Sequence, residues 1–183
     1  MSKHIMVDLE TLGQSPGCSI LSIGAVVFDP YNRTLGGEFY RVVNRASCNA
    51  AGLSEDASTL AWWQRQNAKA REVIAEAETA PLGIAEAIEE FSAYVRGFGG
   101  GDVRIWGNGS DFDNAILAVC YERTGQKMPW RFWNNRCFRT LKSLSPKGKE
   151  APRQGVYHNA LDDAKTQAYA AIAYLQRYRA LAE

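Results

Sequence analysis

The order of strand-like and helix-like segments predicts an α/β fold whose mixed sheet is antiparallel in its first part and parallel in its second. Two observations carry this prediction. Three apolar strand-like segments come first, and helical patterns that enclose one further short strand follow. With 183 residues and 46% hydrophobic content, the chain is expected to form a single domain over residues 1–183.

The first part of the chain contains three expected strands, at residues 3–9, 20–28 and about 35–43. The turn residues Asp29-Pro30-Tyr31-Asn32 join the second strand to the third, so these two are expected to pair as an antiparallel hairpin. Residues 44–54 are small and polar, which predicts a loop before the helical part begins.

The second part of the chain is mainly helical. In order, the expected elements are a helical segment at residues 54–77, a helix that starts at Pro81 and ends at Gly97, a strand at 102–107, a helix from Phe112 to Gly125, an irregular basic segment, and a terminal helix at 159–182. The helix from Pro81 is the clearest, because Ile84, Ile88 and Phe91 recur at its 3.6-residue period.

Composition excludes several classes of protein. The net charge of +1 provides no overall field for a nucleic-acid or membrane partner. The four cysteines are far apart, without a C-x-x-C pair, which favours reduced thiols in a cytosolic protein and argues against zinc. No signal-peptide pattern opens the sequence, and no apolar run approaches the roughly 20 residues that span a bilayer. We therefore expect a cytoplasmic protein without a membrane partner.

Asp8 and Glu10 end the first expected strand. Side chains alternate across a strand, so both carboxylates point to the same side. Two carboxylates held close together repel each other unless a cation lies between them, and carboxylate oxygens suit Mg²⁺ or Mn²⁺. The pair alone is weak support for a metal site, because Asp-x-Glu is common and usually marks a solvated strand end.

A second acidic cluster, residues 107–113, lies where the later strand meets its helix. Ligands of α/β sheets bind at such carboxyl ends of strands. Asp111 or Asp113 could simply cap the helix, where acids are favoured by the helix dipole. Capping explains Asp111 well and Asp113 less well, because Asp113 lies inside the first turn.

A third cluster, residues 158–163, opens the terminal helix. His158 is one of only two histidines in the chain. A histidine near a helix start is more often structural than catalytic, but an imidazole is also well suited to accept a proton from water. Asp162 and Asp163 follow it, and the residues alone leave both open as ligands, because adjacent helix positions point about 100° apart.

Together these motifs resemble the DEDDh-type 3′–5′ exonucleases, which have a ribonuclease H-like fold. Val-Asp8-Leu-Glu10-Thr is similar to the first motif of that family, Asn108 to Asp113 to the second, and His158 with Asp163 five positions later to the third. Ser-Thr-Leu-Ala-Trp62-Trp63 and Trp106-Gly-Asn-Gly are similar to a bacterial and phage subgroup that includes the mycobacterial exoribonuclease and exonuclease VIII-like proteins. The implied fold is a mixed five-stranded sheet flanked by helices.

The resemblance implies a metal-dependent 3′–5′ exonuclease that acts on single-stranded 3′ ends and releases nucleoside 5′-monophosphates. Two Mg²⁺ or Mn²⁺ ions would be held by four carboxylates, those of Asp8, Glu10, Asp113 and Asp163, and His158 would be the general base. Family spacing favours Asp163 over Asp162. The rival interpretation is a catalytically weak nucleic-acid-binding module that keeps the fold. DNA or RNA preference, and whether the chain is a monomer or a homodimer, stay open.

Residues that could hold the substrate form three groups. Thr11 and Leu12 would contact the terminal nucleotide according to the resemblance, although Leu12 could equally belong to the core. Asn108 and Trp106 are candidates in the second motif. Basic and aromatic residues alternate over residues 130–157, which suits single-stranded nucleic acid; the alternative is a strand with core aromatics and a solvated lysine loop. The basic candidates there include Arg136, Arg139 and Lys142. Trp62 and Trp63 are expected to pack a helix or a dimer contact, although one of them could stack on a base.

Overall fold

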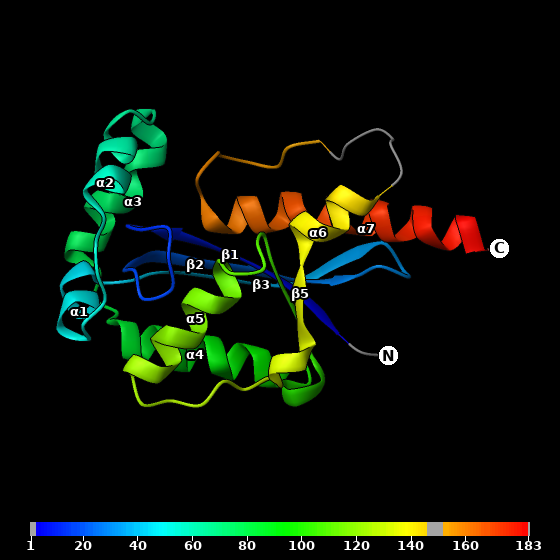
Figure 1. Ribbon diagram of the computed structural model, residues 1–183, viewed down its shortest axis with the longest axis horizontal. Helices are drawn as coiled ribbons and strands as arrows, with labels where there is room; N and C mark the ends of the chain where they lie inside the picture. Colours follow the sequence, from blue (N-terminus) through cyan, green and yellow to red (C-terminus); the bar gives the residue numbers. More distant parts are fainter. Residues whose placement is uncertain (1–2, 146–151, 183) are drawn as a thin grey trace.

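The computed structural model describes residues 3–145 and 152–182 and contains a five-stranded sheet of order β3-β2-β1-β4-β5 (Figure 1). The first three strands pair antiparallel, and the last two run parallel to β1. The strands are β1 His4–Thr11, β2 Ile20–Asp29, β3 Thr34–Val42, β4 Arg104–Gly107 and β5 Asn135–Cys137. This is the mixed sheet that the sequence predicts.

Helices cover both faces of the sheet (Figure 1). The α-helices are α1 Arg45–Ala50, α2 Ala57–Gln64, α3 Ala68–Thr79, α4 Ile84–Gly97, α5 Asp113–Arg123, α6 Phe138–Leu144 and α7 Ala160–Ala182, and two short 3₁₀ helices are η1 Gly100–Asp102 and η2 Phe132–Asn134. One face carries α6 and α7, the other carries α4 and α5, and α1, α2 and α3 lie together at one end of the sheet (Figure 1). Of the helices that the structure describes, none combines the length and apolar character that crossing a membrane requires.

Strand β1 separates two hydrophobic cores. Ile5, Val7 and Leu9 point into the core shared with α4 and α5, whereas Met6 points into the core shared with α6 and α7. Because side chains alternate along a strand, Asp8 and Glu10 follow Met6 onto the α7 side. The acidic pair therefore lies beneath the first turns of α7.

Glycine at position 24 brings α7 close to the sheet. Gly24 lies on β2 directly opposite Asp8 of β1. A Cβ atom at this position would stand 2.1 Å from the carbonyl carbon of Ala160, in the first turn of α7, and backbone cannot yield at that distance. The missing side chain lets the start of α7 rest on the sheet next to Asp8.

Three predicted boundaries are wrong. Residues 44–54, expected to be a loop, contain α1, because the Asn44 side chain accepts a hydrogen bond from the Ser47 backbone N–H and caps a helix there. The segment at 54–77 divides into α2 and α3, because Asn67 caps a new helix by accepting from the Ala70 backbone N–H. The segment expected to be irregular contains β5 and α6, since three strand residues are too few to show alternation.

Candidate active site

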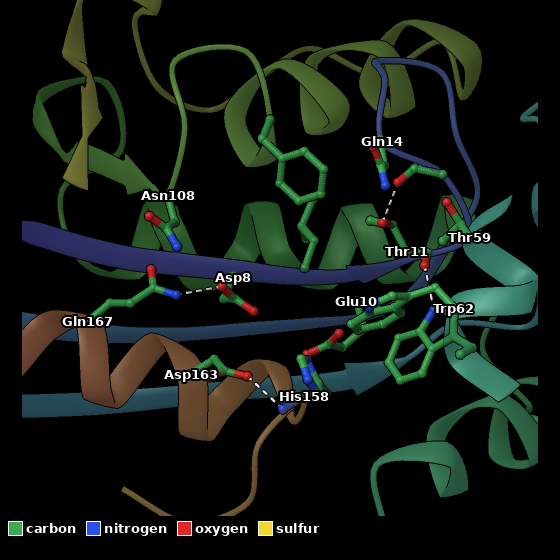
Figure 2. A pocket seen from close by; sticks show the side chains of 14 residues that line it. Asp8, Glu10, Thr11, Gln14, Thr59, Trp62, Asn108, His158, Asp163 and Gln167 are labelled. Carbon is green, nitrogen blue, oxygen red and sulfur yellow. Dashed lines mark hydrogen bonds between the residues drawn. The ribbon is translucent and has the colours of Figure 1, made fainter. Parts of the chain in front are cut away.

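The acidic pair of β1 lines a cavity of about 340 Å³ between the end of the sheet, α2 and the start of α7 (Figure 2). Glu10 is 6% exposed, and Asp8 is half-buried. Figure 2 shows both carboxylates on the side that faces Asp163 and His158. The structure thus confirms that the two side chains share a face.

Asp113 is the first residue of α5 and lies behind the cavity. It is 1% exposed, and each carboxylate oxygen accepts a backbone hydrogen bond, Oδ1 from Leu9 N–H at 3.2 Å and Oδ2 from Asn108 N–H at 2.6 Å. Gly107 makes room for it, because a Cβ there would stand 2.9 Å from the Asp113 Cβ. Asp113 therefore connects β1 to the end of β4, and it does not line the cavity itself.

The start of α7 directs Asp163, and not Asp162, toward the cavity. Asp163 Oδ2 accepts the backbone N–H of His158 at 2.9 Å, and both residues line the cavity. Asp162 Oδ2 instead accepts a hydrogen bond from the backbone N–H of Val156 at 2.7 Å. The Asp162 side chain therefore holds the loop that precedes α7. His158 has φ +61°, an uncommon left-handed conformation for a non-glycine residue.

Two tryptophans of α2 enclose the His158 ring. Its centroid lies 4.9 Å from that of Trp62 at an interplanar angle of 87°, and 6.0 Å from that of Trp63 at 75°. Trp63 is 1% exposed and donates its indole N–H to the backbone carbonyl of Thr11 at 2.9 Å. Trp63 therefore packs a helix as expected, while the half-buried Trp62 forms a wall of the cavity.

Burial and mutual repulsion make these carboxyls poor acids in the metal-free protein. Burial, followed by the charges of Asp113, Glu10 and Asp163, raises the pKa of Asp8 well above its ordinary value. Burial and the Asp163 and Asp113 charges raise the pKa of Glu10 to about 8. Burial raises the pKa of Asp113 to about 6, against the backbone N–H groups that lower it. Repelling carboxyls of this kind suit a cation.

The donor atoms fit a divalent metal ion. Glu10, His158 and Asp163 each offer one ligand atom, and these atoms lie within 4.8 Å of one another. Asp8 joins them across the cavity, and Asp113 lies near enough for its charge to raise the pKa of Asp8 and Glu10. Oxygen-rich sets of this kind are what Mg²⁺ and Mn²⁺ take in proteins.

The predicted substrate residues near the metal site divide into two groups. Thr11 and Asn108 line the cavity. Leu12 and Trp106 do not, and these two assignments are corrected. Leu12 is 0% exposed and packs in the core with Trp63, while Trp106 is 6% exposed and donates its indole N–H to His4 Nδ1 at 3.0 Å. Apolar packing, rather than substrate contact, explains both side chains.

The basic candidates lie outside the cavity, on β5 and α6. Arg139 is exposed and near enough to Asp113 that its charge lowers the pKa of that carboxyl. Arg136 donates from Nη1 to the backbone carbonyls of Trp133 and Asn135, and Lys142 is exposed on α6. Lys147 and Lys149, two further basic residues of the segment 130–157, lie outside the described residues.

The aromatics of the basic segment do not form one set. Trp130 and Phe138 are buried at 4% and 6% exposure and belong to the cores, as the alternative interpretation expects. Phe132, Trp133 and Tyr157 are 69%, 59% and 61% exposed. The alternation in the sequence therefore mixes packing residues with surface residues.

Three residues that the motifs do not include also line the cavity: Gly13, Gln14 and Gln167. Gln167 donates from Nε2 to Asp8 Oδ1 at 2.6 Å. Its position could have been found in the sequence, because it follows Asp163 by four residues on an expected helix and so shares its face. Gly13 and Gln14 carry no such signal.

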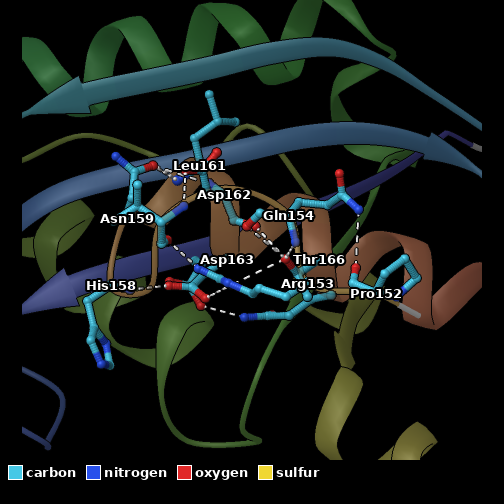
Figure 3. A network of polar contacts seen from close by, with 12 residues as sticks. Pro152, Arg153, Gln154, His158, Asn159, Leu161, Asp162, Asp163 and Thr166 are labelled. Carbon is cyan, nitrogen blue, oxygen red and sulfur yellow. Dashed lines mark hydrogen bonds and ion pairs between the residues drawn. The ribbon is translucent and has the colours of Figure 1, made fainter. Parts of the chain in front are cut away.

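Arg153 joins the loop before α7 to Asp163 (Figure 3). Its Nη1 forms an ion pair with Asp163 Oδ1 and a hydrogen bond with Thr166 Oγ1, and its Nη2 donates to the Val156 carbonyl. The guanidinium carbon lies 4.3 Å from the ring centroid of Tyr157. The Arg153 charge opposes the rise that burial causes in the Asp163 pKa.

Comparisons with known proteins agree with this geometry. Residues 3–175 match the model of the family described as the 3′–5′ exoribonuclease Rv2179c-like domain. A protein of Enterobacteria phage T4 called exodeoxyribonuclease is 25% identical over 158 residues, which cover 74% of this chain and 68% of that protein.

Two solved structures share the fold. The nuclease domain of 3′hExo, a DEDDh family member bound to rAMP, superposes with a TM-score of 0.65 at 13% identity, over 96% of this chain and 92% of that one. Exonuclease I of E. coli in complex with a dT13 oligonucleotide gives a TM-score of 0.70 at 14% identity, over 99% of this chain and 42% of that one.

Proposed function

The chain belongs to the family of 3′–5′ exoribonuclease Rv2179c-like domains and is a 3′–5′ exonuclease, and from this premise we propose how its residues act. It hydrolyses the terminal phosphodiester bond of single-stranded nucleic acid at the 3′ end, in a metal-dependent reaction that releases nucleoside 5′-monophosphates. The observation that carries the proposal is the convergence of three distant segments on one cavity. Asp8 and Glu10 of β1 and His158 and Asp163 at the start of α7 line the cavity, and Asp113 at the start of α5 lies directly behind it.

We propose that Asp8, Glu10, Asp113 and Asp163 hold two divalent ions, Mg²⁺ or Mn²⁺. Each carboxylate has about four lone-pair positions, so the two backbone hydrogen bonds of Asp113 leave it able to bind a cation as well. When bound, divalent cations supply the positive charge that stabilises a phosphoryl displacement. The carboxylates position that charge, and their own repulsion disfavours the metal-free state.

His158 is the proposed general base. Its ring lies in the cavity beside Glu10 and Asp163, where an attacking water would stand. The hydrogen bond from the His158 backbone N–H to Asp163 holds the backbone of this residue, and the two tryptophans pack against its ring. An imidazole held in this way can accept the proton of the water as it attacks the phosphorus.

The terminal nucleoside would occupy the part of the cavity that is lined by Thr11, Gln14 and Trp62. Figure 2 shows these side chains together at the end of the cavity opposite Asp8 and Gln167. Asn108 lies near Asp8, where it could meet the phosphate. The upstream strand would pass the basic residues of β5 and α6, of which Arg139 is nearest to the site.

The rival interpretation, a binding module without activity, loses support at this site. A degenerate member of the family would be expected to lack at least one carboxylate or the histidine, and this chain has all five residues. A cytosolic location remains a prediction from the cysteine pattern.

Digestion of 5′-labelled DNA and RNA oligonucleotides tests the proposal directly. With Mg²⁺ or Mn²⁺ we expect a ladder of products that shorten from the 3′ end, with release of nucleoside 5′-monophosphates, and with EDTA we expect none. Asp8→Asn is the matched control, because it removes one charge at constant size. Cleavage in EDTA, or full activity in folded Asp8→Asn, would refute the metal-dependent mechanism. The relative rates on the two substrates decide between DNA and RNA.

A further inference from the structure

Gln167 stands out among the cavity residues because it contacts a proposed metal ligand without being one. It lies on α7 one turn after Asp163 and is 9% exposed. Its Nε2 donates to Asp8 Oδ1 at 2.6 Å, a contact between segments 159 residues apart (Figure 2). One oxygen of Asp8 is thereby fixed by the protein, and the other is left for the cavity.

The other end of the same amide has no partner. Gln167 Oε1 is buried, and within the described part of the chain no donor reaches it. A buried polar oxygen without a hydrogen bond is rare in proteins and indicates a partner that is not part of the chain. This oxygen belongs to a residue that lines the metal cavity, at the end where Asp8 and Asn108 also lie.

The orientation of the amide follows from Asp8. When Asp8 holds a cation, its carboxylate is ionised and only accepts hydrogen bonds, so in that state the NH₂ group of Gln167 faces Asp8 and Oε1 faces away, as in the structure. A second carboxylate at position 167 would repel Asp8, and a lysine would compete with a cation for it. A glutamine satisfies Asp8 without changing the charge of the site.

We propose that Gln167 is a positioning residue for the metal site. Its N–H orients Asp8 toward the cation, and its Oε1 accepts a hydrogen bond from the water shell of that cation. Mg²⁺ and Mn²⁺ sites keep several waters, and second contacts of this kind tune how tightly the ligands hold the ion. The inference rests on the proposed function, since it assumes that Asp8 binds a divalent ion.

The test is Mn²⁺ binding, measured by isothermal titration calorimetry without substrate, for wild type, Gln167→Met and Gln167→Asn. Methionine keeps the length and loses both polar atoms, and asparagine keeps the amide but is one carbon too short to reach Asp8. We expect each variant to bind Mn²⁺ about 10–100-fold more weakly, the usual loss when such a supporting contact is removed. In exonuclease assays the Mn²⁺ concentration for half-maximal rate should rise by a similar factor, and kcat at saturating Mn²⁺ should change much less.

Gln176→Met is the matched control. Gln176 lies on the same helix, and its amide bonds at both ends within the chain, to the Arg33 side chain and to the Pro30 carbonyl, so neither end is left for a cation or its waters. The Gln176→Met variant should bind Mn²⁺ with the affinity of wild type. Wild-type affinity in either folded Gln167 variant would overturn the inference and make Gln167 a packing residue. If wild type itself neither binds Mn²⁺ nor cleaves, the proposed function fails instead, so the two failures are distinct.

Discussion

Arg153 and Asp163 form an ion pair that occupies one oxygen of a proposed metal ligand. Both side chains are mostly buried, at 19% and 20% exposure, and Arg153 also holds the Val156 carbonyl two residues before His158. In the metal-free protein the guanidinium therefore supplies the positive charge that a bound cation would otherwise supply. It balances the Asp163 charge among three other carboxylates, and it anchors the loop that carries the proposed base.

Arg153→Gln should destabilise the metal-free protein by about 1–3 kcal/mol, because it leaves a buried charge without a partner. For a domain of this size that is roughly 2–12 °C in Tm. The loss should shrink in saturating Mg²⁺, which supplies the missing charge. Thermal unfolding in EDTA and in Mg²⁺ measures both values.

Arg131→Gln is the control for that prediction. Arg131 pairs with Asp102, and these side chains are 55% and 78% exposed, so water already screens the pair. Its removal should change stability by less than about 1 kcal/mol in either buffer. An equal loss of Tm for Arg153→Gln with and without Mg²⁺ would show that the ion pair has no relation to the metal site.

Metal-free stability should fall as pH rises from 6.5 to 8.5. Glu10 has its pKa raised in the folded protein from 4.5 to about 8, so the folded state keeps a proton that the unfolded state has lost. That stability is complete below pH 4.5 and disappears as the pH passes about 8. Asp8, Asp113 and Asp163 shift in the same direction.

The pH range from 6.5 to 8.5 excludes the titration of His4, whose effect on stability has the opposite sign. Burial lowers the pKa of His4 from 6.5 to about 4, so its contribution to stability is lost only as the pH falls below 6.5. Urea unfolding in EDTA at pH 6.5, 7.5 and 8.5 measures the decline, and Glu10→Gln should flatten it. Saturating Mg²⁺ should remove most of the decline in stability with pH. A rise in metal-free stability across this range would contradict the carboxyl pKa shifts.

His158→Ala should lower the cleavage rate by about 10²–10⁴-fold, the usual contribution of a general base, and should largely keep metal binding. In the same assay Asp163→Asn should nearly abolish cleavage, and Asp162→Asn should be much milder, because Asp162 holds the Val156 backbone N–H away from the cavity. Single-turnover rates at saturating metal separate these effects. A ranking with Asp162→Asn as the more damaging change would place the ligand one residue earlier.

Arg139→Gln should weaken binding of a single-stranded oligonucleotide and flatten its salt dependence by about 0.7 log units per log unit of salt, the slope of one phosphate contact. Arg136→Gln and Lys142→Gln should each do the same if they contact the strand. Binding is measured with Ca²⁺ in place of Mg²⁺ at several salt concentrations. Cleavage at saturating substrate should change much less. An unchanged slope in all three variants would show that the strand enters elsewhere.

The sequence predicts the sheet well, and it also predicts where Asp8, Glu10 and Asp113 lie on it, because both depend on local patterns. Alternation on β1 places Asp8 and Glu10 on one face, and a strand followed by a helix places Asp113 at the sheet edge. The sequence predicts contacts between distant segments poorly. Nothing local shows that Trp106 bonds to His4, or that Gln167 reaches Asp8 across 159 residues. Asp163 could be distinguished from Asp162 only by family spacing, since the deciding contact is a backbone N–H of the preceding loop.

Gly24 sets the thickness of the layer between β2 and α7, and so the gap across which Asp8 faces Asp163. A single added methyl group, as in Gly24→Ala, would lift the helix without removing any ligand, base or substrate residue. Inactive variants of this nuclease can therefore carry every motif intact. A survey of natural variants that reads only the acidic residues and the histidine would count such chains as active enzymes, whereas the identity of residue 24 would tell them apart.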